Sequence, residues 1–285
     1  LEQKLKIETI EKYSNQSLGD ALKEIAGVSS LKTGNAIVKP IINGLYGSRV
    51  PIINNNVRLE DQQWGTEHAP NLDINSAGKI TVIKGASGLQ YGGDAVGGLV
   101  IIEPISVKKD TVFGKTLFNF DSNGKGGSAS SSFHNAKLIG WSYNLLGTFK
   151  YIGDKSAPDY VLSNTGNREN NFAGEIKFSR KQYDFIGSYS FFNATIGILS
   201  ASHTGNANDL YQSINNQIPS VIEDFTYTIN SPRQEVQHHI AKVNFNYRWN
   251  EIASLGIQYA FQYNKRLEFD IRRGSFSNTA ALDLD

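Results

Sequence analysis

Residues 79–102 read KITVIKGASGLQYGGDAVGGLVII, and more of the fold can be predicted from them than from any other part of the sequence. Its two ends, 80–83 and 99–102, are short β-branched runs of the kind that forms strands. The segment between them is dense in glycine, which adopts positive φ and lets two backbones approach closely at little steric cost. The stretch therefore predicts a strand, a compact glycine loop and a second strand.

These glycines do not fit a phosphate-binding loop. The GxxxxGK[ST] pattern is absent, because Lys84 precedes the glycines and no helical pattern follows them. The GxGxxG pattern is absent as well. An ordinary glycine-rich β-hairpin in a soluble sandwich remains an alternative, but it does not predict the rest of the chain.

The same stretch resembles the end of the plug domain of TonB-dependent outer-membrane receptors, where a strand runs into a KG-aS-LYG-AiGG-I-I block. The matching residues are Lys84, Gly85, Ser87, Leu89, Tyr91, Gly92, Ala95, Val96, Gly97, Gly98, Val100 and Ile102.

Segment 41–70 extends the resemblance, because Arg49 and Arg58 match the family element i-RG--g-Rvl-LiDGvr. Asn43, Asn55 and Asn56 replace the Arg, Asp and Gly of that element. The asparagines at 54–56 join two β-branched runs, 49–53 and 57–59, that are expected to form strands. Asparagine tolerates left-handed conformations, so a tight hairpin is expected there.

A short helix is expected after residue 17. Ser17 is a plausible N-cap with Asp20 as its capping-box partner, an apolar stripe follows over 18–25, and Gly27 closes the helix. This segment resembles the helix that opens the family's plug.

Composition excludes several classes of function. The net charge of +1 argues against a nucleic-acid binder, and the absence of cysteine excludes disulfides and thiolate chemistry. No apolar run approaches the ~20 residues of a membrane-spanning helix. Residues 1–13 lack the features of a signal peptide, so we expect a mature or trimmed form.

Beyond Pro104 the pattern becomes period-two, with large apolar residues on one side of each segment. Such rows occupy 143–151, 172–178, 243–249 and 255–263. The breaks alternate in length: those near 134–137, 180–182 and 250–252 are short, and those at 153–169 and 195–235 are long and polar. Transmembrane barrels alternate short periplasmic turns with long extracellular loops. We predict about seven strands, beginning near Gly114.

The predicted fold is an α+β plug domain followed by part of a transmembrane antiparallel β-barrel, which is 22-stranded in the full-length family. The expected boundaries are 1–108 for the plug and 111–285 for the barrel strands. Seven strands do not close such a barrel, and the sequence ends at ALDLD without a terminal aromatic strand. The remaining strands are therefore expected to lie outside this sequence.

Three residues are candidates for ligand binding. Glu67 and His68, in a loop between plug strands, could offer a carboxylate oxygen and an imidazole nitrogen to a divalent cation. The period-two row over 243–247 directs His239 outward and His238 inward, so His238 could complete the site. The alternatives are a solvated loop with a chance histidine and an interfacial polar pair. His134, expected in a short turn, and His203, expected in a long loop, are not candidates.

The resemblance implies a receptor of the Gram-negative outer membrane that takes up a scarce nutrient such as a metal ion, metal chelate or siderophore. It implies no cofactor beyond a metal or chelate as transported ligand. The implied partners are the inner-membrane TonB energy-transducing complex, membrane lipid, the ligand and a surface lipoprotein, with no nucleic acid. No catalytic residues are predicted. The alternatives are a soluble or surface-attached β-rich adhesin and a glycan-active enzyme.

Overall fold

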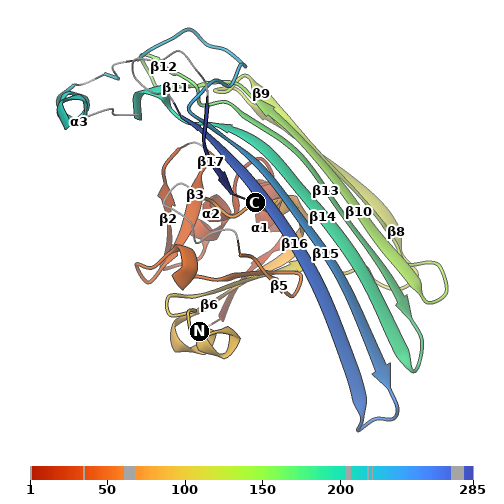
Figure 1. Ribbon diagram of the computed structural model, residues 1–285. Helices are drawn as coiled ribbons and strands as arrows, with labels where there is room; N and C mark the ends of the chain where they lie inside the picture. The colour runs from red at the N-terminus through yellow and green to blue at the C-terminus, as the bar shows by residue number, and fades with distance from the viewer. Residues whose placement is uncertain are drawn as a thin grey trace.

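The computed structural model describes residues 2–34, 36–60, 68–202, 207–216, 218–219, 221–270 and 279–284. These residues form an N-terminal unit that lies against one face of a long, curved sheet (Figure 1). We call the face toward the N-terminal unit the inner face and the opposite one the outer face. This arrangement is the predicted plug followed by part of a barrel.

The N-terminal unit is built on a five-stranded sheet in the order β1-β6-β7-β4-β5. Only β4 and β7 pair in parallel. The helices and the two-stranded sheet β2-β3 complete the unit. The elements are β1 (Glu2–Lys6), α1 (Ile7–Lys12), α2 (Leu18–Ala21), β2 (Val28–Lys32), β3 (Val38–Ile42), β4 (Ile52–Asn54), β5 (Val57–Arg58), β6 (Ala77–Lys84) and β7 (Gly98–Pro104).

The core of this unit comes from the β-branched runs recognised in the sequence. Ile80 and Val82 of β6, Val100 of β7 and Ile52 of β4 are fully buried. They pack in one cluster with Leu22, which follows α2. Burial of these side chains holds the sheet and the helices together.

The glycine stretch folds as predicted. Strand β6 leads into a run of 3-10 helix, η4 (Gly85–Tyr91), and β7 returns antiparallel to β6. A Cβ on Gly97 would lie 2.8 Å from Cβ of Leu45 and 3.0 Å from the carbonyl oxygen of Arg49. Gly98 has φ +143, and a Cβ there would lie 2.6 Å from the carbonyl oxygen of Ile83. Both positions need glycine because the neighbouring chain is too close for any side chain.

The expected hairpin and capping box are also confirmed. Asn55 and Asn56, at φ 49 and 61, form the turn between β4 and β5. Ser17 and Asp20 cap α2 reciprocally. The helix itself is shorter than predicted, because η1 (Leu22–Glu24) continues it as a 3-10 turn. Arg49 was expected in a strand but lies in a 3-10 turn, η2 (Gly47–Arg49).

The curved sheet has eight strands in the order β17-β16-β15-β14-β13-β10-β9-β8, and every pair of neighbours is antiparallel. A small β11-β12 hairpin and α3 lie in the long connections (Figure 1). The elements are β8 (Val112–Asp121), β9 (Gly126–Asn135), β10 (Trp141–Ile152), β11 (Lys155–Ser156), β12 (Val161–Leu162), β13 (Asn167–Ser179), β14 (Tyr183–Gly197), α3 (Ala207–Asn215), β15 (Arg233–Arg248), β16 (Ser254–Asp270) and β17 (Thr279–Leu284).

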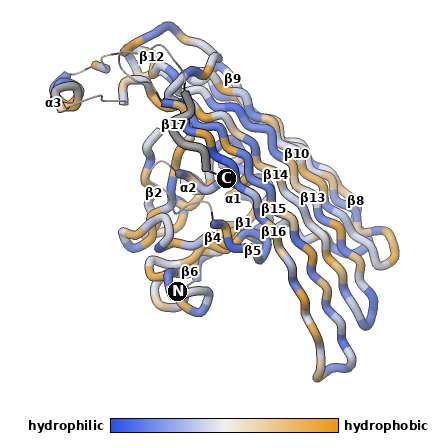
Figure 2. The backbone as a smooth tube through the Cα atoms, in the orientation of Figure 1, coloured by the Kyte–Doolittle hydropathy of each residue, from blue (hydrophilic) through white to orange (hydrophobic). Residues whose placement is uncertain are grey.

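Hydropathy alternates along these strands, as the tube in Figure 2 shows. On β16 the outward residues Ile257, Tyr259 and Phe261 are 55%, 68% and 53% exposed. The alternate residues Gln258 and Gln262 donate hydrogen bonds to carbonyl oxygens of the N-terminal unit. The outer face is therefore apolar and exposed, whereas the inner face is polar and partly covered.

Two details differ from the sequence-based expectation. The described sheet has eight strands where about seven were expected; its first strand begins at Val112, near the expected Gly114. His134 lies in β9 instead of a turn; it is buried, stacks on Phe113 and contacts the Asn144 amide. Serine and glycine dominate β9, so the apolar alternation that marks the other strands is weak there.

Among the described residues, no helix combines the length and apolar character needed to cross a membrane.

Replacing Gly97 with valine should destabilise the N-terminal unit by about 1–3 kcal/mol or more, because the new side chain would overlap Leu45 and the Arg49 carbonyl. Gly93→Ala is the matched control, since a Cβ there meets nothing within 4 Å. Hydrogen exchange across β6 and β7 measures the effect. Equal exchange in the two variants would show that the close approach at Gly97 is not limiting.

Candidate functional site: the polar interface between the two units

The inner face of β15 and β16 presents a row of polar side chains to the N-terminal unit. Period-two geometry turns every second side chain of a strand the same way. The polar members of the row whose hydrogen bonds are described below are Gln234, His238, Lys242, Gln258, Gln262, Arg266 and Glu268. Their hydrogen bonds reach two places in the N-terminal unit: segment 68–71 and the β4–β5 hairpin.

His68 fixes one end of segment 68–71. Its Nε2 lies 2.7 Å from Oε1 of Glu268, and the amide of Gln234 donates to the same oxygen at 3.1 Å. His68 and Gln234 are 4% and 1% exposed. The contact is therefore a buried pairing between the N-terminal unit and two neighbouring strands.

Asn71 fixes the other end of the segment. Arg266 donates to Oδ1 of Asn71 at 3.1 Å and to Oε1 of Gln234 at 2.7 Å. His238 Nδ1 donates to the backbone carbonyl of Asn71 at 3.1 Å. We call His68, Asn71, Gln234, His238, Arg266 and Glu268 the His68 network. It joins the N-terminal unit to β15 and β16 through side chains that are buried or partly buried.

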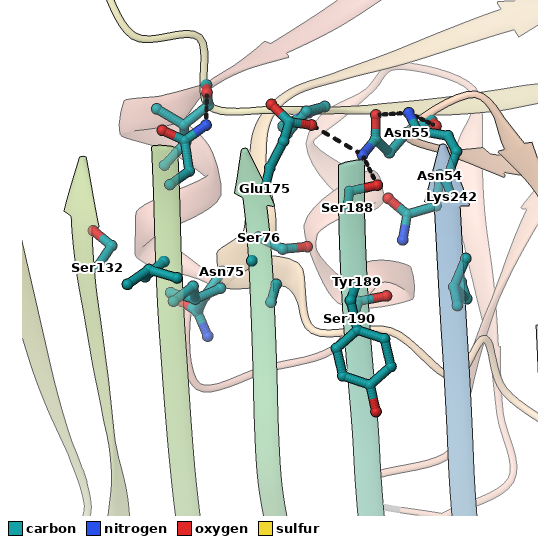
Figure 3. Close-up of a pocket in the computed structure, with 18 of the residues that line it drawn as sticks. Asn54, Asn55, Asn75, Ser76, Ser132, Glu175, Ser188, Tyr189, Ser190 and Lys242 are labelled. Carbon is teal, nitrogen blue, oxygen red and sulfur yellow. Dashed lines mark hydrogen bonds between the residues drawn. The ribbon is translucent and has the colours of Figure 1, made fainter. Parts of the chain in front are cut away.

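The β4–β5 hairpin makes a second contact, nearer the short turns. Figure 3 shows Asn55 at the edge of a cavity between the two units. Lys242 donates to the backbone oxygen of Asn55 at 2.7 Å and to its side-chain oxygen at 2.6 Å. The Asn55 amide in turn donates to Glu175 at 3.3 Å and to Ser188 at 3.4 Å. The neutral Asn55 side chain thus pairs with both a cation, Lys242, and an anion, Glu175, of the curved sheet.

Between these two contacts lies a buried carboxyl group, Asp73. Burial raises its pKa, and hydrogen bonds from Thr148 and Asn75 offset this only in part. Beside it, β10 and β13 of the curved sheet carry an ion pair in which Lys150 Nζ lies 2.7 Å from Oε1 of Glu169. The negative charge of Glu169 also favours the protonated form of Asp73.

Lys39 adds a buried cation to the N-terminal unit. It is 3% exposed and lies 5.8 Å from the centre of the Tyr46 ring. Burial, together with the positive charge of Arg266, lowers the pKa of Lys39 to about 8.

The motif arginines and Lys84 act inside the N-terminal unit. Arg58 donates to Asp94 at 3.1 Å and thereby ties the hairpin to the glycine loop. This hydrogen bond holds the pKa of Asp94 below its usual value. Lys84 donates to the carbonyl oxygen of Ala26. Arg49 contributes its carbonyl oxygen, which accepts from the N–H of Gly97 at 3.0 Å.

The ligand-binding candidates fall in different contacts of the His68 network. His68 pairs with Glu268, His238 faces inward as predicted and pairs with Asn71, and Glu67 lies outside the described residues. In the part of the chain that the structure describes, no three His, Asp or Glu side chains form a group that could hold a metal ion.

Sequence reasoning missed four members of the network: Asn71, Gln234, Arg266 and Glu268. Their partners are up to 200 residues away, so no local spacing reveals them. The alternation of inward and outward side chains could have identified three of them, because Gln234, Arg266 and Glu268 all point to the polar side of β15 and β16. His239, on the other parity, lies outward, with its Nδ1 2.7 Å from the Tyr189 hydroxyl.

Comparison with known proteins identifies the fold. The family model for the TonB-dependent Receptor Plug Domain matches residues 2–99. The ferric citrate transporter FecA in its unliganded form has a TM-score of 0.70 at 13% identity, with 95% of this chain and 41% of that chain covered. The siderophore receptor PiuA from Acinetobacter baumannii has a TM-score of 0.67 at 15% identity, covering 94% and 37%. The ferric-catecholate import receptor Fiu from K12 E. coli has a TM-score of 0.69 at 14% identity, also covering 94% and 37%. The chain spans about two-fifths of the length of these receptors.

Replacing Arg266 with methionine should loosen segment 68–71. The variant loses two hydrogen bonds from a charged donor, of which each is worth about 2 kcal/mol. Amide exchange in residues 68–76 should therefore accelerate by roughly 30-fold or more. Arg248→Met is the control, because Arg248 bonds Asp184 and turn carbonyls at the far end of the sheet. Acceleration in both variants would point to general destabilisation of the sheet.

Asp73 and Asp20 should affect stability with opposite signs. The raised pKa of Asp73 means that folding favours its protonated form, so its contribution is lost as pH rises from the usual aspartate range through the raised value. Burial acts on Asp20 in the same direction, but the hydrogen bonds from Lys23 and Ser17 outweigh it and lower the pKa of Asp20. The contribution of Asp20 to stability is therefore lost as pH falls.

Asp73→Asn should therefore raise the melting temperature of the N-terminal unit near neutral pH, whereas Asp20→Asn should lower it. Both differences should shrink toward pH 3. A destabilising Asp73→Asn at neutral pH would contradict the assignment of burial as the dominant effect on Asp73.

Proposed function

We propose that this chain belongs to an outer-membrane transporter for active uptake of a scarce nutrient. The proposal rests on the match of residues 2–99 to the TonB-dependent receptor plug domain and on the barrel strands that follow. The observation that carries the proposal is the polar interface: the plug covers the inner face of a sheet whose outer face is apolar and exposed. An adhesin or an enzyme does not require this combination.

The domain division proposed from the sequence is a plug over 1–108 and barrel strands over 111–285. Between β7 and β8 the chain runs through 105–111 without a helix or strand, which supports a boundary there. The long connections would face the cell exterior and the short turns the periplasm. The His68 network then lies toward the exterior end of the plug, and the Asn55 contact toward the periplasm.

The proposed substrate is a metal chelate, with ferric siderophores as the leading class. This rests on the receptors of the same fold, which are described as a ferric citrate transporter and siderophore receptors. The proposed partners are the inner-membrane TonB complex, which supplies the energy, and the lipid around the barrel. A resident cofactor is not part of the proposal.

Glu67, His68 and His238 remain the proposed ligand contacts. His68 and His238 come from a plug loop and a barrel strand, so a ligand that contacts both would sense the relative position of the two units. Both imidazoles are buried and hydrogen-bonded in this structure. Ligand binding would therefore require the His68 network to rearrange, and this links recognition to the release of the plug.

Uptake of radiolabelled ferric chelates by iron-limited cells tests the proposed function. Cells that produce the intact receptor should accumulate one class of chelate in a saturable manner, and deletion of TonB should abolish the accumulation. Uptake that is unchanged without TonB would contradict energy-coupled transport. Accumulation equal to that of cells without the receptor, for all chelates tried, would contradict the substrate class.

His68→Ala should weaken binding of the transported metal or chelate by about tenfold or more, the usual loss when a metal ligand's surroundings are removed. His239→Ala is the control, because its imidazole points outward. Binding to the unmodified receptor should weaken in acid, since protonated imidazole cannot coordinate a metal. Calorimetric titration measures both effects, and equal affinity in the two variants would remove His68 from the ligand site.

A further inference from the structure

The outer face carries a cluster of aromatic and basic side chains that the transport mechanism does not use. It lies where β10 and β13 meet the long connections. Tyr151 is the last outward residue of β10, and Arg168 is its partner on β13. Tyr227, Phe225 and Lys125 come from two connections at the same end of the sheet.

Tyr227 organises this cluster. Its ring stacks on Tyr151 with centroids 5.2 Å apart and meets Phe225 edge-on at 5.1 Å. Its hydroxyl donates to the backbone oxygen of Lys125 at 2.6 Å, and its own carbonyl accepts from Arg168 at 2.7 Å. Tyr227 thus positions Lys125 and Arg168 beside a group of three aromatic rings.

Uncharged groups orient both cations. Among the residues that the structure describes, Lys125 and Arg168 form no ion pair with a carboxylate. Lys125 Nζ lies 4.1 Å from the Phe225 ring centre, and Arg168 Cζ lies 5.0 Å from that of Tyr151. Cation–π contacts orient these groups but leave their charges available.

The cluster is continuous with the apolar outer face. Below Tyr151 on the same row lie Phe149 and Leu145, which are 53% and 44% exposed. Aromatic side chains gather where hydrocarbon gives way to headgroups, and basic residues placed there attract anionic lipid. Guanidinium and ammonium groups donate charge-assisted hydrogen bonds to phosphate oxygens.

We propose that Lys125 and Arg168, on the floor formed by Tyr151, Phe225 and Tyr227, bind the phosphate of an outer-leaflet lipid headgroup. The lipid's acyl chains would lie along the row that ends at Tyr151. This inference rests on the proposed placement of the barrel in the outer membrane, with the long connections outside.

Native mass spectrometry of the intact receptor in mild detergent tests the proposal, with lipid A, whose headgroup carries phosphate, as the titrated probe. Lys125→Gln with Arg168→Gln should weaken binding roughly 25-fold, about fivefold for each charge removed. Lys125→Arg with Arg168→Lys should keep most of the affinity. Lys181→Gln, in the short turn at the opposite end, is the matched control. Lys125→Gln alone, at an exposed turn side chain, should still show about a fivefold loss if the double variant does not fold.

Equal affinity of the unmodified receptor and a folded charge-removing variant would overturn the proposal, as would an equal loss in Lys181→Gln. Displacement of lipid A by millimolar inorganic phosphate would also overturn it, because the site would then recognise phosphate without the lipid. If the receptor is absent from outer-membrane fractions, the proposed function fails. If it is present there but shows no preference for phosphorylated lipid, only this inference fails.

Discussion

The inner face of the curved sheet is polar, and this determines how the N-terminal unit can pack against it. A buried charge or amide without a hydrogen-bond partner costs free energy, so the charged groups of β15 and β16 need partners where the N-terminal unit excludes water. Asn55 supplies the partner for Lys242, and Asn71 supplies one for Arg266. The plug is thus held by hydrogen bonds, whereas its own interior is held by apolar burial.

This combination of a polar interface and an apolar interior suits the proposed transport function, in which the plug stays folded while it is displaced from the barrel. A polar interface loses little when water replaces its hydrogen bonds, because water satisfies the same groups. An apolar interface of the same area would resist displacement. The glycines at 97 and 98 serve the other requirement: they bring the chain segments of the plug close together and keep its core compact.

Local sequence predicted the elements whose cause is local. The capping box at Ser17, the asparagine hairpin and the strand–glycine–strand stretch all depend on neighbours within a few residues, and all are present. Parity predicted that His238 faces inward and His239 outward. The pairings across the interface could not be predicted, because the partner of each polar side chain is chosen by how two units meet. Apolar alternation marked β10, β13, β15 and β16 in the sequence, whereas β9, rich in serine and glycine, shows little of it.

Spin labels at Ile257 and Gln258 of the full-length protein in a bilayer would distinguish a plugged membrane barrel from other arrangements of this sheet. These neighbours on β16 lie on opposite faces: Ile257 is exposed on the outer face, and Gln258 donates to Asn56 of the plug. A plug held inside a membrane barrel predicts that the label at 257 is accessible to oxygen dissolved in the lipid and that the label at 258 is not. Equal accessibility of both labels to oxygen would contradict the account.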